Sequence, residues 1–183
     1  MAATLAGAFR DDPAWSWVFA DHETREVGLR AVWSLLLAGA VDYGWVSMVP
    51  GAEAATLWIP AGRPELTDAE SARIGPLFRE LLGPEAGRAD ALMERFATAR
   101  PTEPEHYYLS LFGTRPDRRG HGIGMALLAA DLARIDAEGT PAYLESTTPA
   151  NLDRYRSVGF VDHGEIILPN GGPTVTTMWR EAR

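Results

Sequence analysis

Three glycines in the second half of the chain have the spacing of an anion-binding turn. Gly120, Gly122 and Gly124 alternate with other residues between two apolar runs. Glycine adopts backbone conformations that a Cβ would forbid and lets a ligand approach the main chain closely. Between a strand and the start of a helix, such a turn directs amide N–H groups outward, where the helix dipole favours an anion. The segment therefore predicts a cradle for a pyrophosphate group.

Two common phosphate-binding loops do not fit this segment. The Walker loop requires Gly-Lys-Ser/Thr, and all 17 basic residues of this chain are arginine. A dinucleotide fingerprint that began at Gly120 and Gly122 would require glycine at the position of Met125. A third pattern, Arg/Gln-x-x-Gly-x-Gly/Ala, is met by Arg119, Gly122 and Gly124.

The third pattern is the acetyl-coenzyme A loop of the GNAT superfamily of N-acetyltransferases, which the chain resembles. A second segment, residues 151–160, strengthens the resemblance. There Tyr155, Gly159 and Phe160 match the family's closing motif, a tyrosine followed by a charged turn, glycine and phenylalanine. Two motifs in the family's order are far more specific than either alone. The resemblance implies an α/β (α+β) fold, a mixed central sheet flanked by helices, with acetyl-coenzyme A as cosubstrate and no metal.

The resemblance also implies how acetyl-coenzyme A is held. The strand before the glycine turn would open away from its neighbour, so that its backbone at Phe112 and Thr114 pairs with the pantetheine arm. The amides from Arg119 to Met125 would hold the pyrophosphate, and Asn151 would hydrogen-bond the pantetheine or steady the motif tyrosine. The predicted cofactor-binding residues are therefore Phe112, Thr114, Arg119, Gly120, Gly122, Gly124, Met125 and Asn151.

Acetyl transfer from a thioester to an amine needs an acid, a base and a group that stabilises the oxyanion. A phenol has a reference pKa of about 10, against roughly 8.5 for a thiol, so Tyr155 can donate a proton to the departing sulfur. Glu145, on the strand expected after the loop helix, is the candidate base for the ammonium proton, directly or through water. The alternatives are a core tyrosine and a structural carboxylate paired with an arginine. A backbone N–H near 112–114 is expected to meet the oxyanion.

Composition excludes several other chemistries. The chain has 183 residues, enough for one domain over 1–183 with a sizeable core. It has no cysteine, which rules out disulfides, thiolate metal sites and a cysteine nucleophile. Its four histidines lack the His-x-x-x-His spacing of a metal site, and Gly-x-Ser-x-Gly is absent.

Charge and hydropathy bear on partners and location. The net charge of −8 argues against nucleic acid as the main partner. The longest apolar stretches are too short to span a membrane, and no signal-peptide pattern opens the chain, so we expect a cytoplasmic protein with no membrane partner. A homodimer is compatible with the sequence, which leaves the oligomeric state open.

Hydrophobic periodicity predicts an alternation of helices and strands. Val27, Ala31 and Leu35 recur at helical spacing, and Thr67 with Glu70 predicts a capping box. Helices are expected at 23–40, 67–82, 85–98, 122–138 and 149–157. Strands are expected at 45–49, 55–59, 106–113, 142–147, 159–168 and 174–180.

Three further segments resemble the puromycin N-acetyltransferase-like branch of the family. They are residues 9–13, 103–109 and 143–147. The family begins with a strand and then a helix, whereas residues 1–9 look like the tail of that helix. The first strand is therefore expected to be missing, through a late start, a truncation or a sheet that lacks one edge.

The sequence thus predicts an N-acetyltransferase that moves acetyl from acetyl-coenzyme A to a primary amine of a small molecule, directly in a ternary complex. The alternatives are a non-catalytic acyl-coenzyme A binding or regulatory module, a structural partner, and an enzyme for larger acyl groups. Five tryptophans in the first third are candidates for an acceptor pocket, although most are expected to be packing: Trp15, Trp17, Trp33, Trp45 and Trp58.

Overall fold

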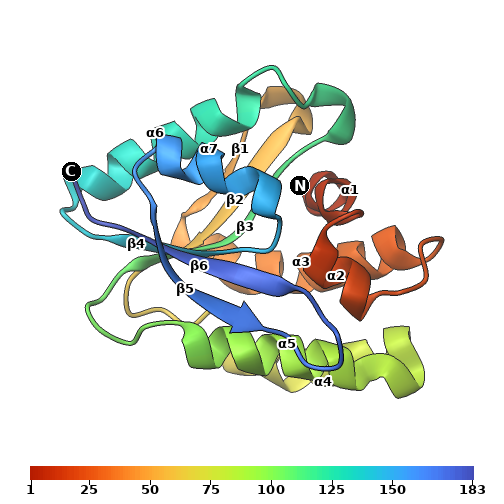
Figure 1. Ribbon diagram of the computed structural model, residues 1–183. Helices are drawn as coiled ribbons and strands as arrows, with labels where there is room; N and C mark the ends of the chain where they lie inside the picture. The colour runs from red at the N-terminus through yellow and green to blue at the C-terminus, as the bar shows by residue number, and fades with distance from the viewer.

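The computed structural model describes residues 1–183 and shows a mixed sheet with helices on both faces (Figure 1). Six strands lie in the order β1-β2-β3-β4-β6-β5. Only β3 and β4 are parallel, and every other neighbouring pair is antiparallel. The strands are β1 (Val46–Met48), β2 (Ala54–Ile59), β3 (Tyr107–Thr114), β4 (Ala142–Ser146), β5 (Val161–Ile167) and β6 (Thr174–Arg180).

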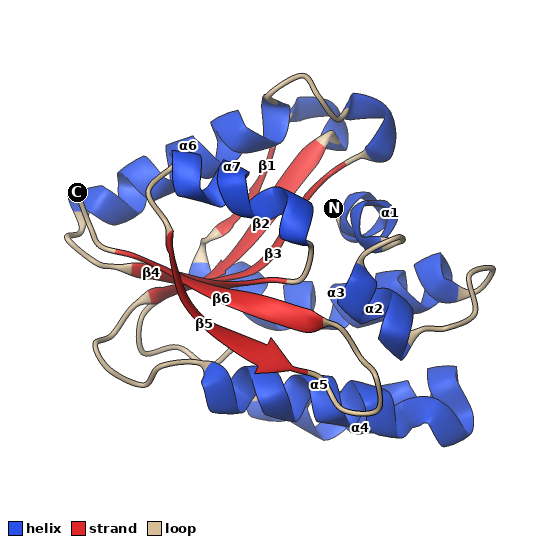
Figure 2. Ribbon diagram, in the orientation of Figure 1, coloured by secondary structure: helices blue, strands red, loops and turns tan.

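Seven α-helices surround the sheet (Figure 2). On one face, α6 packs against β1, β2 and β3. On the other face, α1 and α3 pack on β2 and β3, and α4 and α5 follow beside α3 and β5. The helices are α1 (Ala2–Phe9), α2 (Pro13–Val18), α3 (Arg25–Ala40), α4 (Asp68–Leu82), α5 (Ala86–Ala99), α6 (Ile123–Ala137) and α7 (Leu152–Ser157). No helix is long and apolar enough to cross a membrane.

The predicted elements are all present, with ends that shift by a few residues, and the expected fold class is confirmed. Helix α2 was not predicted because its six residues are too few to show a period. It is started by Asp12, whose carboxylate accepts hydrogen bonds from the amides of Ala14 and Trp15, with Pro13 in the first turn. The first element is α1, a helix, as the opening residues indicate.

The predicted capping box at the start of α4 is wrong in its hydrogen bonds. The Thr67 hydroxyl donates to the Glu70 carboxylate, and no side chain caps the backbone amides. The physical reason is that Glu70 is buried against α3, where its carboxylate lies in the space beside Gly39. Packing between α3 and α4 has taken the carboxylate away from the helix end.

The two faces of the sheet have separate cores. The core under α1 to α5 holds 25 buried residues, among them Trp33, Phe78 and Tyr143. The core under α6 and α7 holds 12, among them Trp58 and Leu128. Side chains alternate between these faces along each strand, so a strand residue belongs to one core or the other unless the pairing is interrupted.

Candidate active site

Strands β3 and β4 separate part of the way along their length. They pair only where Tyr107–Leu109 meets Ala142–Leu144, and beyond Leu109 strand β3 pairs with β2 alone as far as Thr114. The register between β2 and β3 shifts opposite Leu57 and Trp58, which is the irregularity of a β-bulge. The predicted opening in the sheet is therefore present, and it leaves the β4-facing edge of residues 110–114 without a strand partner.

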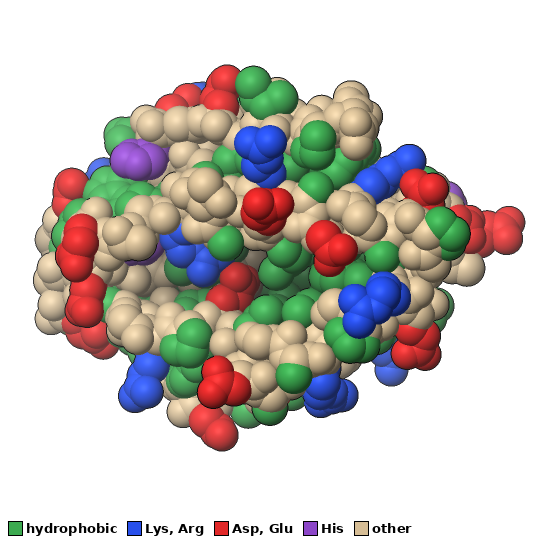
Figure 3. Space-filling model, turned by 90° about the horizontal axis from the view of Figure 1, so that it is seen from below, with side chains coloured by type: hydrophobic (Ala, Val, Ile, Leu, Met, Phe, Trp, Pro, Cys, Tyr) green, Lys and Arg blue, Asp and Glu red, His purple; other side chains and the backbone are tan.

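A cleft of about 1060 Å³ passes through this opening. At one end it is lined by the glycine turn and by α7, and at the other by α3, α4 and α5. The space-filling view shows a hollow lined by hydrophobic side chains with acidic and arginine side chains beside it (Figure 3). This volume is at the upper end of the range for small-molecule sites.

The glycine turn forms an open cradle at the start of α6. Gly120 and Gly122 have φ angles of 80° and 74°, and nothing lies within 4 Å of where their Cβ atoms would stand. Gly122 caps α6, so the first amides of that helix have no partner within it. Gly124 is glycine for a different reason, because a Cβ there would collide with the Thr114 hydroxyl and lie 3.2 Å from the Phe112 ring.

The arginines of the turn are engaged by other parts of the protein. The predicted phosphate ligand Arg119 lines the cleft, but its Nη2 donates to the carbonyl of Ala8, 2.8 Å away, at the end of α1. Arg118 pairs with Glu53 at 2.6 Å. The amides at the start of α6 therefore provide unpartnered donors to the cradle, and a phosphate role for Arg119 stays a prediction.

Tyr155 extends from α7 into the cleft at the opening between the strands. Its ring packs edge-on against Phe112 and Phe160, with centroids 6.3 and 6.1 Å apart. Burial raises the pKa of the Tyr155 phenol, and the charge of Asp12 raises it further. The side chain is therefore protonated at neutral pH, as an acid for a departing thiolate must be.

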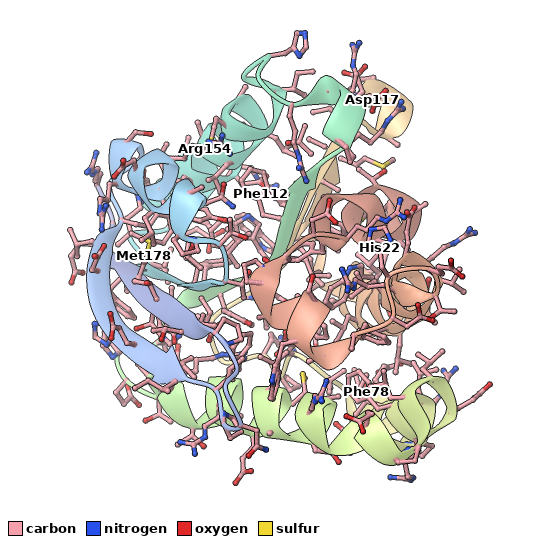
Figure 4. All side chains as sticks on the ribbon, turned by 45° about the vertical axis from the view of Figure 1, so that its right-hand side comes forward. His22, Phe78, Phe112, Asp117, Arg154 and Met178 are labelled. Atoms are coloured by element: carbon pink, nitrogen blue, oxygen red, sulfur yellow. The ribbon has the colours of Figure 1, made fainter.

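Asn151 also lines the cleft, but it does not steady Tyr155. Its Oδ1 accepts a hydrogen bond of 2.8 Å from Nη1 of Arg154. Figure 4 shows Arg154 on α7 and Phe112 on β3 near the opening, while Phe78 rises from α4 below. Phe112, Thr114 and Met125 line the same cleft, so the structure brings all the predicted cofactor-binding residues together.

Glu145 reaches the cleft from the opposite face of the sheet to Tyr155. It follows Leu144, which lies in the core under α6 and α7, and so shares the face of Tyr143. Its Oε1 is buried and has no hydrogen-bond partner. Burial raises the pKa of Glu145 to about 7, and the nearby Arg100 guanidinium only partly offsets this effect. A carboxyl group with a pKa near 7 is suited to accept a proton at neutral pH.

Beside Glu145 lies an ion pair that sequence analysis did not identify. Nη2 of Arg100 is 3.0 Å from Oε2 of Glu65, and the Ser110 hydroxyl donates to the other carboxylate oxygen at 2.6 Å. The Arg100 guanidinium also lies 3.4 Å from the centroid of the Tyr108 ring. Arg100 therefore forms its ion pair with Glu65, while its charge also acts on the neighbouring Glu145, and the role of Glu145 as the base stays a prediction.

A second unforeseen contact holds the two ends of the cleft together. Besides capping α2, the Asp12 carboxylate accepts hydrogen bonds from the hydroxyls of Thr147 and Thr148, at 2.5 and 2.9 Å. These threonines follow β4 and precede Asn151. The only sequence signal was Asp-Pro, which is typical of a helix start and says nothing of a distant partner.

The tryptophans divide between the two faces. Trp15 and Trp33 line the cleft and pack edge-on with centroids 4.6 Å apart. Trp45 and Trp58 belong to the core under α6 and α7, on the opposite face of the sheet from α3, α4 and α5, and neither lines the cleft. Phe78 of α4 and Phe96 of α5 also line the cleft, which the clustering of tryptophans did not indicate.

The fold of this chain is similar to that of several solved structures. No family model matches the chain. It is similar to a structure described as histone acetyltransferase HPA2 and related acetyltransferase from Corynebacterium glutamicum, with 23% identity, a TM-score of 0.70, and coverage of 100% of this chain and 89% of that one. The chain is also similar to an agmatine N-acetyltransferase, with 18% identity, a TM-score of 0.60, and coverage of 97% of this chain and 90% of that one. Arylalkylamine N-acetyltransferase 2 from Aedes aegypti is similar as well, with 13% identity, a TM-score of 0.61, and coverage of 98% of this chain and 92% of that one.

These similarities show that the chain has the fold of the GNAT acetyltransferases. The fold expected from the glycine turn and the closing motif is therefore confirmed. The nearer resemblance to the puromycin N-acetyltransferase-like branch stays a prediction.

Proposed function

We propose that this protein transfers an acetyl group from acetyl-coenzyme A to a primary amine of a small molecule, in a ternary complex. The observation that carries the proposal is the single cleft through the opened sheet. It brings the glycine turn and Tyr155 at one end together with Glu145 from the other face of the sheet. An anion cradle, an acid and a base in one cleft are what this reaction requires.

The residues present fit acetyl-coenzyme A. The cradle formed by Gly120 and Gly122 has space where side chains would stand and unpartnered amides at the start of α6, as a pyrophosphate requires. The free edge of β3 at residues 110–114 offers backbone groups to the amides of a pantetheine arm. Bound there, acetyl-coenzyme A supplies the acetyl thioester.

The protein's own groups then move two protons. Glu145 accepts a proton from the ammonium of the acceptor, which frees the nitrogen lone pair for attack on the thioester carbon. A backbone N–H of β3 near Phe112 to Thr114 stabilises the negative oxygen that forms. Tyr155 donates its phenolic proton to the sulfur as the carbon–sulfur bond breaks. The attacking nitrogen loses its second proton to solvent, and solvent returns a proton to the Tyr155 phenolate and takes the one held by Glu145. The products are an N-acetyl amine and free coenzyme A.

The test is thiol release from acetyl-coenzyme A across a panel of primary amines, with binding of acetyl-coenzyme A measured separately by calorimetry. The panel includes agmatine and arylalkylamines, on which structural neighbours act by name, and aminonucleosides. Amine-dependent thiol release that Tyr155→Phe abolishes supports the proposal. Binding of acetyl-coenzyme A without release for any amine would favour a non-catalytic acyl-coenzyme A module instead.

A further inference from the structure

We propose that the acceptor is a hydrophobic monoamine, with its one ammonium at Glu145 and its apolar body against the aromatic wall formed by α3, α4 and α5. This inference rests on the function proposed above and specifies the acceptor. It distinguishes the cleft from one that takes polyamines or other dications.

The first support is the charge balance at the acceptor end. Arg100 and Glu65 form an ion pair, and Ser110 satisfies the second oxygen of that carboxylate. Glu145 forms no salt bridge, and the side chains nearest its buried carboxyl group besides Arg100 are the neutral phenols of Tyr108 and Tyr143. The acceptor end therefore has one uncompensated carboxylate, which matches one ammonium group.

The second support is the lining beyond Glu145. Trp33, Ile74, Phe78, Met93 and Phe96 all line the cleft and come from three helices. Trp33 and Phe78 are 0% and 1% exposed, so they pack behind the wall and hold it in place before a ligand binds, while the partly exposed Ile74, Met93 and Phe96 give it its open surface. Its surface suits an alkyl or aryl group, whose burial is favourable in proportion to its apolar area.

A second ammonium on the acceptor would find no buried partner along this wall. The remaining carboxylates at the cleft's α5 side, Asp90 and Glu94, are exposed, and pairing with solvated groups contributes little. Arg100 would repel a cation that came near the Glu65 pair. An unpaired buried charge is costly, so a dication should bind and react less well than a monoamine of equal size.

The experiment compares heptylamine with hexamethylenediamine, which have the same number of non-hydrogen atoms. Thiol release gives kcat/KM for each, and calorimetry gives each Kd in the presence of coenzyme A. We expect heptylamine to be favoured at least about tenfold in both quantities, the factor that about 1.4 kcal/mol represents. Equal values, a preference for the diamine, or no binding of either amine would overturn the inference.

The binding measurement separates this inference from the proposed function. Binding of heptylamine with the expected preference, but without thiol release, would refute acetyl transfer while upholding the ligand class. Thiol release with equal kcat/KM for heptylamine and hexamethylenediamine would support acetyl transfer and refute the ligand class.

A variant provides an independent check. Ile74→Glu places a carboxylate on the partly buried α4 wall, and we expect it to reduce the preference for heptylamine at least about fivefold, by improving the diamine. Ala72→Glu makes the same change on the exposed face of α4 and should leave the preference unchanged. An unaltered ratio in the folded Ile74→Glu protein would contradict the placement of the acceptor's body.

Discussion

The carboxylate of Asp12 accepts a hydrogen bond of 2.5 Å from the hydroxyl of Thr147, which lies 135 residues away in the chain. Because Asp12 also caps α2, this contact ties the helix that carries Trp15 to the turn that precedes Asn151. Helix α2, whose Trp15 packs against Trp33 of the acceptor wall, is thereby attached to the segment that would hold the pantetheine.

Asp12→Ala should lower the free energy of unfolding by about 1–3 kcal/mol, because it removes a helix cap and leaves two threonine hydroxyls without their acceptor. Urea denaturation measures the change. Asp11→Ala is the matched control, since its side chain is 79% exposed and touches only His22 at 3.8 Å. Equal effects of the two substitutions on the free energy of unfolding would show that the hydrogen bonds to Asp12 add no stability.

Tyr155→Phe should reduce kcat by about 10²–10⁴-fold while the Kd for acetyl-coenzyme A stays the same, because the ring remains packed and only the proton donor is lost. Steady-state kinetics and calorimetry measure the two quantities. Tyr107→Phe is the control, since that hydroxyl donates to Glu138 away from the cleft. An unchanged kcat for Tyr155→Phe would remove its role as the acid.

The pH dependence of the reaction should report Glu145. With its pKa raised to about 7, the carboxylate is available as a base only above that pH, so kcat/KM should rise through about pH 7. Glu145→Gln should lower the rate and abolish this acid limb, which a pH–rate profile would show. A limb that persists at the same pH in the variant would mean that another group is the base.

Stability should change with pH in the opposite sense. The pKa of Glu145 rises from an ordinary 4.5 to about 7 in the folded chain, so between these values the folded state binds more protons than the unfolded one. The contribution of Glu145 to the free energy of unfolding is therefore present below pH 4.5 and lost as the pH rises to 7, by at most about 3 kcal/mol. Solvent access from the cleft reduces this figure.

The comparison that isolates this effect is wild type against Glu145→Gln, by urea denaturation from pH 4.5 to 8. The variant should gain stability relative to wild type as the pH rises, because it never ionises. Parallel curves for the two proteins would show that the carboxyl group is not desolvated.

Gly124→Ala should destabilise the protein by about 1–3 kcal/mol and weaken acetyl-coenzyme A binding, because the added methyl group pushes the start of α6 away from Thr114 and Phe112. Thermal unfolding and calorimetry measure both effects. Gly87→Ala on α5 is the control, since nothing lies within 4 Å of its Cβ position. A tolerated Gly124→Ala would mean that α6 does not pack as closely on β3 as described.

The elements of the fold could be predicted from sequence because they depend on local rules. The spacing of apolar residues specified the helices, and the alternation of Gly120, Gly122 and Gly124 specified the turn. Helix α2 was not predicted because its six residues are too few to show a hydrophobic period. Its start also depends on Asp12, whose threonine partners lie after β4. The prediction of a capping box was wrong because the Glu70 carboxylate packs beside Gly39 of α3, a contact that only the tertiary structure creates.

By itself, the sequence determined the fold, the anion cradle and the candidacy of Tyr155, since all three reside in short segments whose residue types and spacing suffice. Tertiary structure alone decided which charges are already paired. Arg100 pairs with Glu65 across 35 residues, and Arg119 donates to the carbonyl of Ala8 across 111, which leaves Glu145 as a buried carboxyl group without a salt bridge. The reason is physical: a pKa and a ligand preference depend on desolvation and neighbouring charge, and both are set by segments that meet only when the chain folds.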